Sequence, residues 1–95
     1  MNKEYDNAIT MYTLVEIVDP QNPIPHYHAA DCWSKLEVYP AAIVELESAV
    51  RKSADLPQYA LIKDRSLLTI ESLKAKVGQK KPLEGAANPV EKKGT

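Results

Sequence analysis

The side chains best suited to chemistry in this sequence are two histidines, an aspartate and the single cysteine, all between residues 26 and 32. His28, Asp31 and Cys32 are three and four residues apart, so on a helix they share one face. They could offer a nitrogen, an oxygen and a thiolate to a zinc ion. His26 and His28 are two residues apart and point to different sides of a helix, so they cannot chelate one ion together. Cys32 with His28 is also the minimum for a thiol nucleophile and its base.

The rest of the sequence does not favour either chemistry. A small buried thiol beside a surface histidine accounts for the same residues, and nothing resembles an oxyanion site or a substrate pocket. No glycine precedes Gly78, which excludes the glycine-rich loops of Walker and Rossmann nucleotide sites. We therefore expect no enzymatic activity, no resident metal and no cofactor, and keep a small Cys/His metal-binding protein or thiol enzyme as a third hypothesis.

Composition and charge indicate one small domain without a nucleic-acid or membrane signature. The 95 residues carry 12 Lys and Arg against 13 Asp and Glu, so the basic surface typical of nucleic-acid-binding proteins is missing. No apolar run approaches the roughly 18 residues that span a bilayer, and the N-terminal residues lack the apolar centre of a signal peptide. One cysteine cannot form an internal disulfide, which fits a reducing compartment. We expect a cytoplasmic protein.

The spacing of apolar residues predicts an all-α fold. Such residues recur at three- and four-residue steps, and no segment alternates with a period of two. Asp19-Pro20 should end the first helix, because proline lacks the amide hydrogen that a continuing helix needs. Gly78 is the expected C-cap of the last helix. The four expected helices cover residues 5–18, 23–38, 40–54 and 58–77.

Residues 78–95 differ in composition from the rest of the chain. They hold all three glycines and two of the seven prolines, with only scattered aliphatic side chains. Such a segment cannot bury enough apolar surface to offset the entropy lost on ordering. We predict a disordered basic tail over 78–95 and a folded domain over 5–77.

An internal repeat is the most informative feature of the domain. Ala29 and Ala30 lie between its two copies and precede Trp33. Two antiparallel helices approach closely where one presents small residues, and an aromatic side chain then fills the groove beside them. This order matches the tetratricopeptide repeat. A shift of 34 residues places Tyr5, Ala8, Tyr12 and Val15 on Tyr39, Ala42, Leu46 and Ala49.

The repeat frame predicts an incomplete helical solenoid. A solenoid normally needs about three repeats, so Tyr5, Ile9 and Tyr12 should expose apolar area unless another chain covers them. We therefore expect a homo-oligomer through the N-terminal helix, or a bound partner. The expected units are the second helix of an incomplete repeat (5–19), a complete repeat (23–56) and a closing helix (58–77).

One string in the complete repeat carries a resemblance to a known family. The residues from Pro23 to Trp33, continuing to Tyr39-Pro40 and Ala49, resemble the last repeat of the class II chaperones of bacterial type III secretion, the SycD/LcrH group. In that family a proline-aromatic-His-Ala-Ala-acidic-Cys string opens the third tetratricopeptide repeat. Its members are all-helical cytoplasmic proteins that hold the hydrophobic translocator proteins until export. They carry an N-terminal helical segment and about one and a half further repeats, so this chain resembles a C-terminal portion or a truncated form.

The resemblance implies a binding site for an extended segment of the translocator. In the family this segment lies in a concave groove formed by the first helices of successive repeats. A generic tetratricopeptide interaction module without a secretion role is the alternative function. The groove positions transferred to this sequence are Ile24, Tyr27, Asp31, Ser34 and Lys35 in the complete repeat, with Leu61 and Leu68 on the closing helix.

Overall fold

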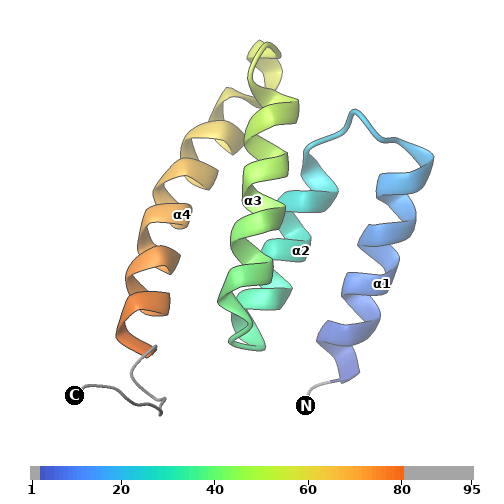
Figure 1. The fold of residues 1–95 in the computed structure, drawn as a ribbon. Coiled ribbons are helices and arrows are strands. Elements are labelled where there is room, and N and C mark those ends of the chain that lie inside the picture. The colour runs from blue at the N-terminus through green and yellow to red at the C-terminus, as the bar shows by residue number, and fades with distance from the viewer. Residues whose placement is uncertain (1–2, 81–95) are drawn as a thin grey trace.

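The computed structural model describes residues 3–80, which fold into four α-helices and one short 3-10 helix. The helices lie side by side, with α3 between α2 and α4 and with α1 against α2 (Figure 1). No strand occurs in the described residues, so the predicted all-α fold is confirmed there. None of these helices is long and apolar enough to cross a bilayer. The elements are α1 (Lys3–Val18), α2 (Ile24–Lys35), α3 (Tyr39–Ser53), η1 (Pro57–Tyr59) and α4 (Ala60–Lys80).

Prolines and one asparagine define where the first helices end and begin. α1 ends at Val18, directly before Asp19-Pro20 as predicted. Asn22 Oδ1 accepts a hydrogen bond from the Ile24 amide at 2.9 Å. This bond satisfies one of the first-turn amides of α2 that has no partner within the helix.

α2 ends at Lys35, three residues earlier than predicted, because the chain turns sharply there. The Val38 amide donates to the Trp33 carbonyl and the Glu37 amide to the Ser34 carbonyl, both at 2.9 Å. These two bonds form a Schellman motif, which requires a left-handed residue after the helix. Glu37 takes that conformation with a φ of 62° although it is not glycine, so no residue type at this position predicts the turn.

The end of α4 corrects a second prediction. α4 continues to Lys80, so Gly78 lies inside the helix and is not its C-cap. A single glycine in a helix costs only about 1 kcal/mol, which the preceding helical residues can offset. The predicted tail therefore begins at least three residues too early, and its remainder, 81–95, lies outside the described residues.

The core lies between α2, α3 and α4. Ala30 of α2 faces Ala42 and Leu46 of α3, and Trp33 packs against the edge of this group. The predicted close packing of these residues is confirmed. Ser66 of α4 is also fully buried and lies on the same helix face as the core residues Ile70 and Leu73. The fully enclosed cluster, at most 6% exposed, consists of Ala30, Ala42, Leu46, Ile70 and Leu73.

α1 packs against α2 through one face and leaves another exposed. Tyr5, Ile9 and Tyr12, which were expected to be exposed, are half-buried, because α2 covers their face. The Tyr12 ring stacks on the His28 ring of α2 with the centroids 5.5 Å apart. The exposed apolar surface of α1 lies further round the helix, and its side chains, 40–84% exposed, are Met11, Leu14, Val15, Ile17 and Val18.

The core predicts the effect of truncating Leu46, which is 1% exposed. Leu46→Ala should lower the free energy of unfolding by about 2–5 kcal/mol, because it leaves a cavity between three helices. Val44→Ala is the control on the same helix, since Val44 is 62% exposed and should change stability by less than about 0.5 kcal/mol. Urea unfolding followed by circular dichroism measures both. Equal losses in the two variants would contradict this assignment of the core.

Candidate functional site

A cavity of about 240 Å³ opens where α2 approaches α4. Three of the predicted groove residues, Tyr27, Asp31 and Ser34, line it together. Thr69 contributes from α4, a residue that the sequence did not single out. The full lining is Tyr27, His28, Ala30, Asp31 and Ser34 of α2, Leu46 of α3 and Thr69 of α4.

The other predicted groove residues lie outside the cavity lining. Lys35 Nζ is 3.4 Å from Asp31 Oδ2, so it pairs with a lining residue one turn away. Ile24 is half-buried at the start of α2. Leu61 and Leu68 of α4 are 61% and 73% exposed and remain accessible on the surface.

The cavity combines an aromatic wall with small polar groups. Tyr27 packs partly against the core, and its ring meets the His28 ring edge-on with the centroids 5.8 Å apart. Asp31, Ser34 and Thr69 add a carboxylate and two hydroxyl groups to the lining. A hollow that combines an aromatic ring with a few polar groups can hold a side chain or a short peptide segment.

The zinc or thiol chemistry considered for His28, Asp31 and Cys32 is not supported by their environments. Cys32 is buried, and this burial, followed by the nearby Asp31 charge, raises the pKa of its thiol above the usual value of 9.0. A raised pKa lowers the fraction of thiolate, which is the form that acts as a nucleophile or a metal ligand. In residues 3–80 the group that could hold a metal consists instead of Glu16, His26 and Glu45.

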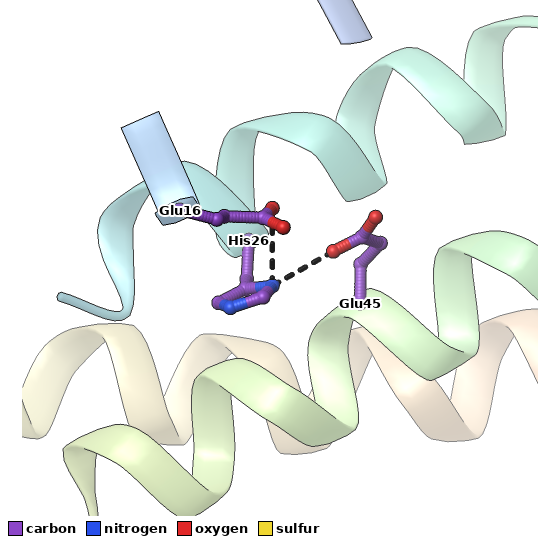
Figure 2. Close-up of side chains that lie close together, drawn as sticks. All are labelled: Glu16, His26 and Glu45. Carbon is purple, nitrogen blue, oxygen red and sulfur yellow. Dashed lines mark hydrogen bonds and ion pairs between the residues drawn. The ribbon is translucent and has the colours of Figure 1, made fainter. Parts of the chain in front are cut away.

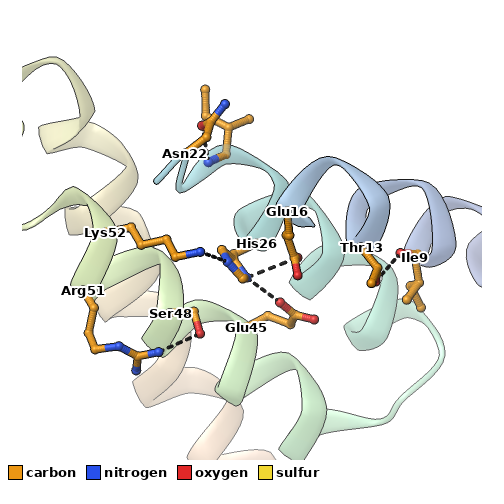
Figure 3. Close-up of polar contacts among 10 residues, drawn as sticks. Ile9, Thr13, Glu16, Asn22, His26, Glu45, Ser48, Arg51 and Lys52 are labelled. Carbon is orange, nitrogen blue, oxygen red and sulfur yellow. Dashed lines mark hydrogen bonds and ion pairs between the residues drawn. The ribbon is translucent and has the colours of Figure 1, made fainter. Parts of the chain in front are cut away.

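His26 is the centre of a polar network that joins three helices (Figure 2). Its ring is buried, with 8% of the residue exposed. His26 Nδ1 lies 2.8 Å from Glu45 Oε1 of α3 and 3.2 Å from Glu16 Oε2 of α1. On the other side of the ring, Lys52 Nζ of α3 lies 2.7 Å from His26 Nε2 (Figure 3).

The hydrogens of this network can be assigned from its partners. A lysine ammonium has only donors, so Lys52 donates to His26 Nε2, and the ring of a neutral histidine then carries its hydrogen on Nδ1. That single hydrogen is donated to Glu45, at the shorter distance. Glu16 Oε2 is buried and has no hydrogen-bond partner.

Burial and the neighbouring Glu45 carboxylate raise the pKa of Glu16. Burial is the larger cause, since it disfavours the charged form, and the second carboxylate adds repulsion. The positive charge of Lys52, and that of His26 when its ring is protonated, act in the opposite direction but do not cancel these effects. The network therefore places two carboxylate oxygens beside His26 Nδ1, and its single hydrogen can bond well to only one of them.

The sequence contained only a weak signal for this network. Its members are separated along the chain, and the packing of three helices brings them together. Glu16 follows Tyr12 at a step of four and so continues the inward stripe of α1 with a charged residue. A carboxylate on a buried stripe requires a partner, which is the signal that could have identified it.

Comparison with known proteins does not assign a role to the cavity or to the network. No protein-family model, no curated protein and no solved structure matches this chain. Any role for the α2/α4 cavity or for the His26 network must therefore be inferred from the geometry of these residues.

The raised pKa of Glu16 predicts a pH-dependent stability. Between the ordinary value of 4.5 and the raised value, the folded state binds more protons than the unfolded state, so the free energy of unfolding falls as pH rises through this window. Glu16→Gln cannot titrate and should lack this decline. Its stability relative to the wild type should therefore increase as pH rises above about 4.5.

Urea unfolding with EDTA present measures this difference. Glu47→Gln is the control, because Glu47 is exposed on α3 and lies outside the network. A Glu16→Gln variant that loses stability relative to the wild type as pH rises would show that the charged carboxylate is favourable.

Proposed function

We propose that this chain is a non-enzymatic module that binds an extended segment of a partner protein along α2 and α4. The cavity between these helices carries the proposal, since it places an aromatic ring, a carboxylate and two hydroxyl groups around one hollow. An extended peptide needs pockets for some of its side chains and polar groups for its backbone. Leu61 and Leu68 offer further apolar contacts along the exposed surface of α4.

A tetratricopeptide-like arrangement is part of this proposal. α2 and α3 pack closely through small residues, and α4 packs against α3 as the first helix of a following unit would. In this arrangement α2 and α4 are the first helices of successive units, and both line the cavity. Stacked helix pairs of this kind use the concave surface formed by such helices for binding.

We propose a translocator protein of bacterial type III secretion as the client, held in the cytoplasm before export. The resemblance of residues 23–33 to the class II secretion chaperones supports this choice. Within that string, Ala29 is buried away from the cavity, while Tyr27 and Asp31 line it, so packing and binding positions alternate as a helix requires. A generic tetratricopeptide module is the alternative and would use the same cavity for other clients.

A bulky side chain introduced into the cavity tests the proposed binding site. Ser34→Trp should weaken the binding of fluorescent peptides that tile the N-terminal regions of type III translocators by at least tenfold, or about 1.4 kcal/mol. Ser48→Trp is the matched control, because Ser48 is also a half-buried serine but does not line the cavity. Fluorescence anisotropy measures both affinities. Unchanged binding in Ser34→Trp would reject this cavity, and binding of unrelated peptides alone would favour the generic module.

We also propose that a second copy of the chain covers the exposed apolar surface of α1. Ile17 and Val18 are 72% and 84% exposed, and this helix has no fully buried side chain. Contiguous apolar surface of this kind favours association.

Ile17→Glu should therefore shift the chain from oligomer to monomer in sedimentation velocity. Leu68→Glu is the control, since Leu68 is equally exposed but lies on α4. A wild-type chain that stays monomeric at high concentration would contradict the proposed self-association.

A further inference from the structure

We propose that Glu16, His26 and Glu45 form a binding site for one divalent transition-metal ion, with zinc as the best match. The three residues come from α1, α2 and α3, and their ligand atoms all lie within 4.8 Å of one another (Figure 2). His26 is buried and the two carboxylates are mostly buried, at 18% and 19% side-chain exposure. The site lies apart from the α2/α4 cavity and does not depend on the proposed peptide binding.

The donor set suits a borderline metal ion. An imidazole nitrogen among the donors favours Zn²⁺ and related transition metals, whereas Mg²⁺ and Ca²⁺ prefer oxygen ligands alone. Bonds of about 2.0–2.1 Å in a tetrahedral site place the donor atoms about 3.3 Å apart. His26 Nδ1 already lies 2.8 and 3.2 Å from the two oxygens, so these two nitrogen–oxygen pairs need to separate by at most about half an ångström.

A second observation is the oxygen of Glu16 that makes no hydrogen bond. Glu16 Oε2 is buried without a hydrogen-bond partner, although it points toward His26 Nδ1 (Figure 2). Buried polar atoms are nearly always paired, and those that are not often mark the place of an absent ion or water. A cation between Nδ1 and the two carboxylates would satisfy this oxygen and remove the repulsion between Glu16 and Glu45.

Lys52 must move when the metal binds. A metal ion on Nδ1 places the ring hydrogen of a neutral histidine on Nε2, where it faces the Lys52 ammonium, a second donor, at 2.7 Å. Lys52 is half-buried on a flexible side chain and can turn into solvent. Its positive charge therefore competes with the metal and limits the affinity of the site.

This competition predicts a gain of affinity in one variant. In Lys52→Gln the amide oxygen can accept the hydrogen of Nε2, which is the outer hydrogen bond that metal-bound histidines usually make. Zinc should bind Lys52→Gln several-fold more tightly than the wild type. A merely structural network gives no reason for this gain.

Titration of zinc chloride into the tag-free, EDTA-stripped full chain, followed by calorimetry, tests the site. We expect one zinc ion per chain, no heat from magnesium chloride, and a raised midpoint of thermal unfolding with zinc, since the ion joins α1 to the α2–α3 pair. Glu16→Gln and Glu45→Gln should each weaken zinc binding by at least tenfold. Glu47→Gln and the double variant His28→Ala, Cys32→Ser should bind as the wild type does.

The outcomes separate the proposal from its alternatives. No zinc binding, or full binding in both Glu16→Gln and Glu45→Gln, would overturn it. Loss of binding in the His28 and Cys32 double variant would move the site to the other face of α2. Circular dichroism of each variant checks that the helices remain folded, and Lys52→Gln keeps the proposal testable if a glutamate variant unfolds.

Discussion

The close approach of α2 to α3 is the constraint on which the rest of the structure depends. Ala30 and Ala42 have no side chain beyond Cβ, so the two helix backbones come together there and Leu46 extends toward α4. This contact sets the distance between α2 and α4 and therefore the size of the cavity between them. A larger residue at either alanine would separate the helices and change both the core and the binding surface.

The polar network around His26 is a second contact that holds the helices together, and it lies on another side of α2 from the cavity. It joins α1 to the α2–α3 pair through charged groups, while α1 contributes no fully buried side chain of its own. Charged groups in such a place contribute little net stability, because burial costs about as much as the pairing returns. Their retention inside the bundle fits a role in specificity or in ion binding better than a role in stability.

Local pattern predicted much of the fold, and contacts between distant segments account for what it missed. The helical period identified the four helices, and the order of Ala29, Ala30 and Trp33 identified the close packing of α2. Tyr27, Asp31 and Ser34 came from the resemblance to the secretion chaperones rather than from their spacing, and the structure places all three on one cavity. The His26 network depends on three helices at once, and the turn at Glu37 uses a residue that rarely adopts a positive φ, so neither could be read from spacing.

The most direct test of the central claim, peptide binding between α2 and α4, is a map of the bound surface by NMR. A ¹⁵N-labelled chain titrated with the tightest translocator peptide should show its largest amide shifts at Tyr27, Asp31, Ser34 and Thr69, with little change along α1. Largest shifts at the opposite side of α4, around Glu71 and Lys74, or on α1, would contradict the assignment of the cavity as the binding site.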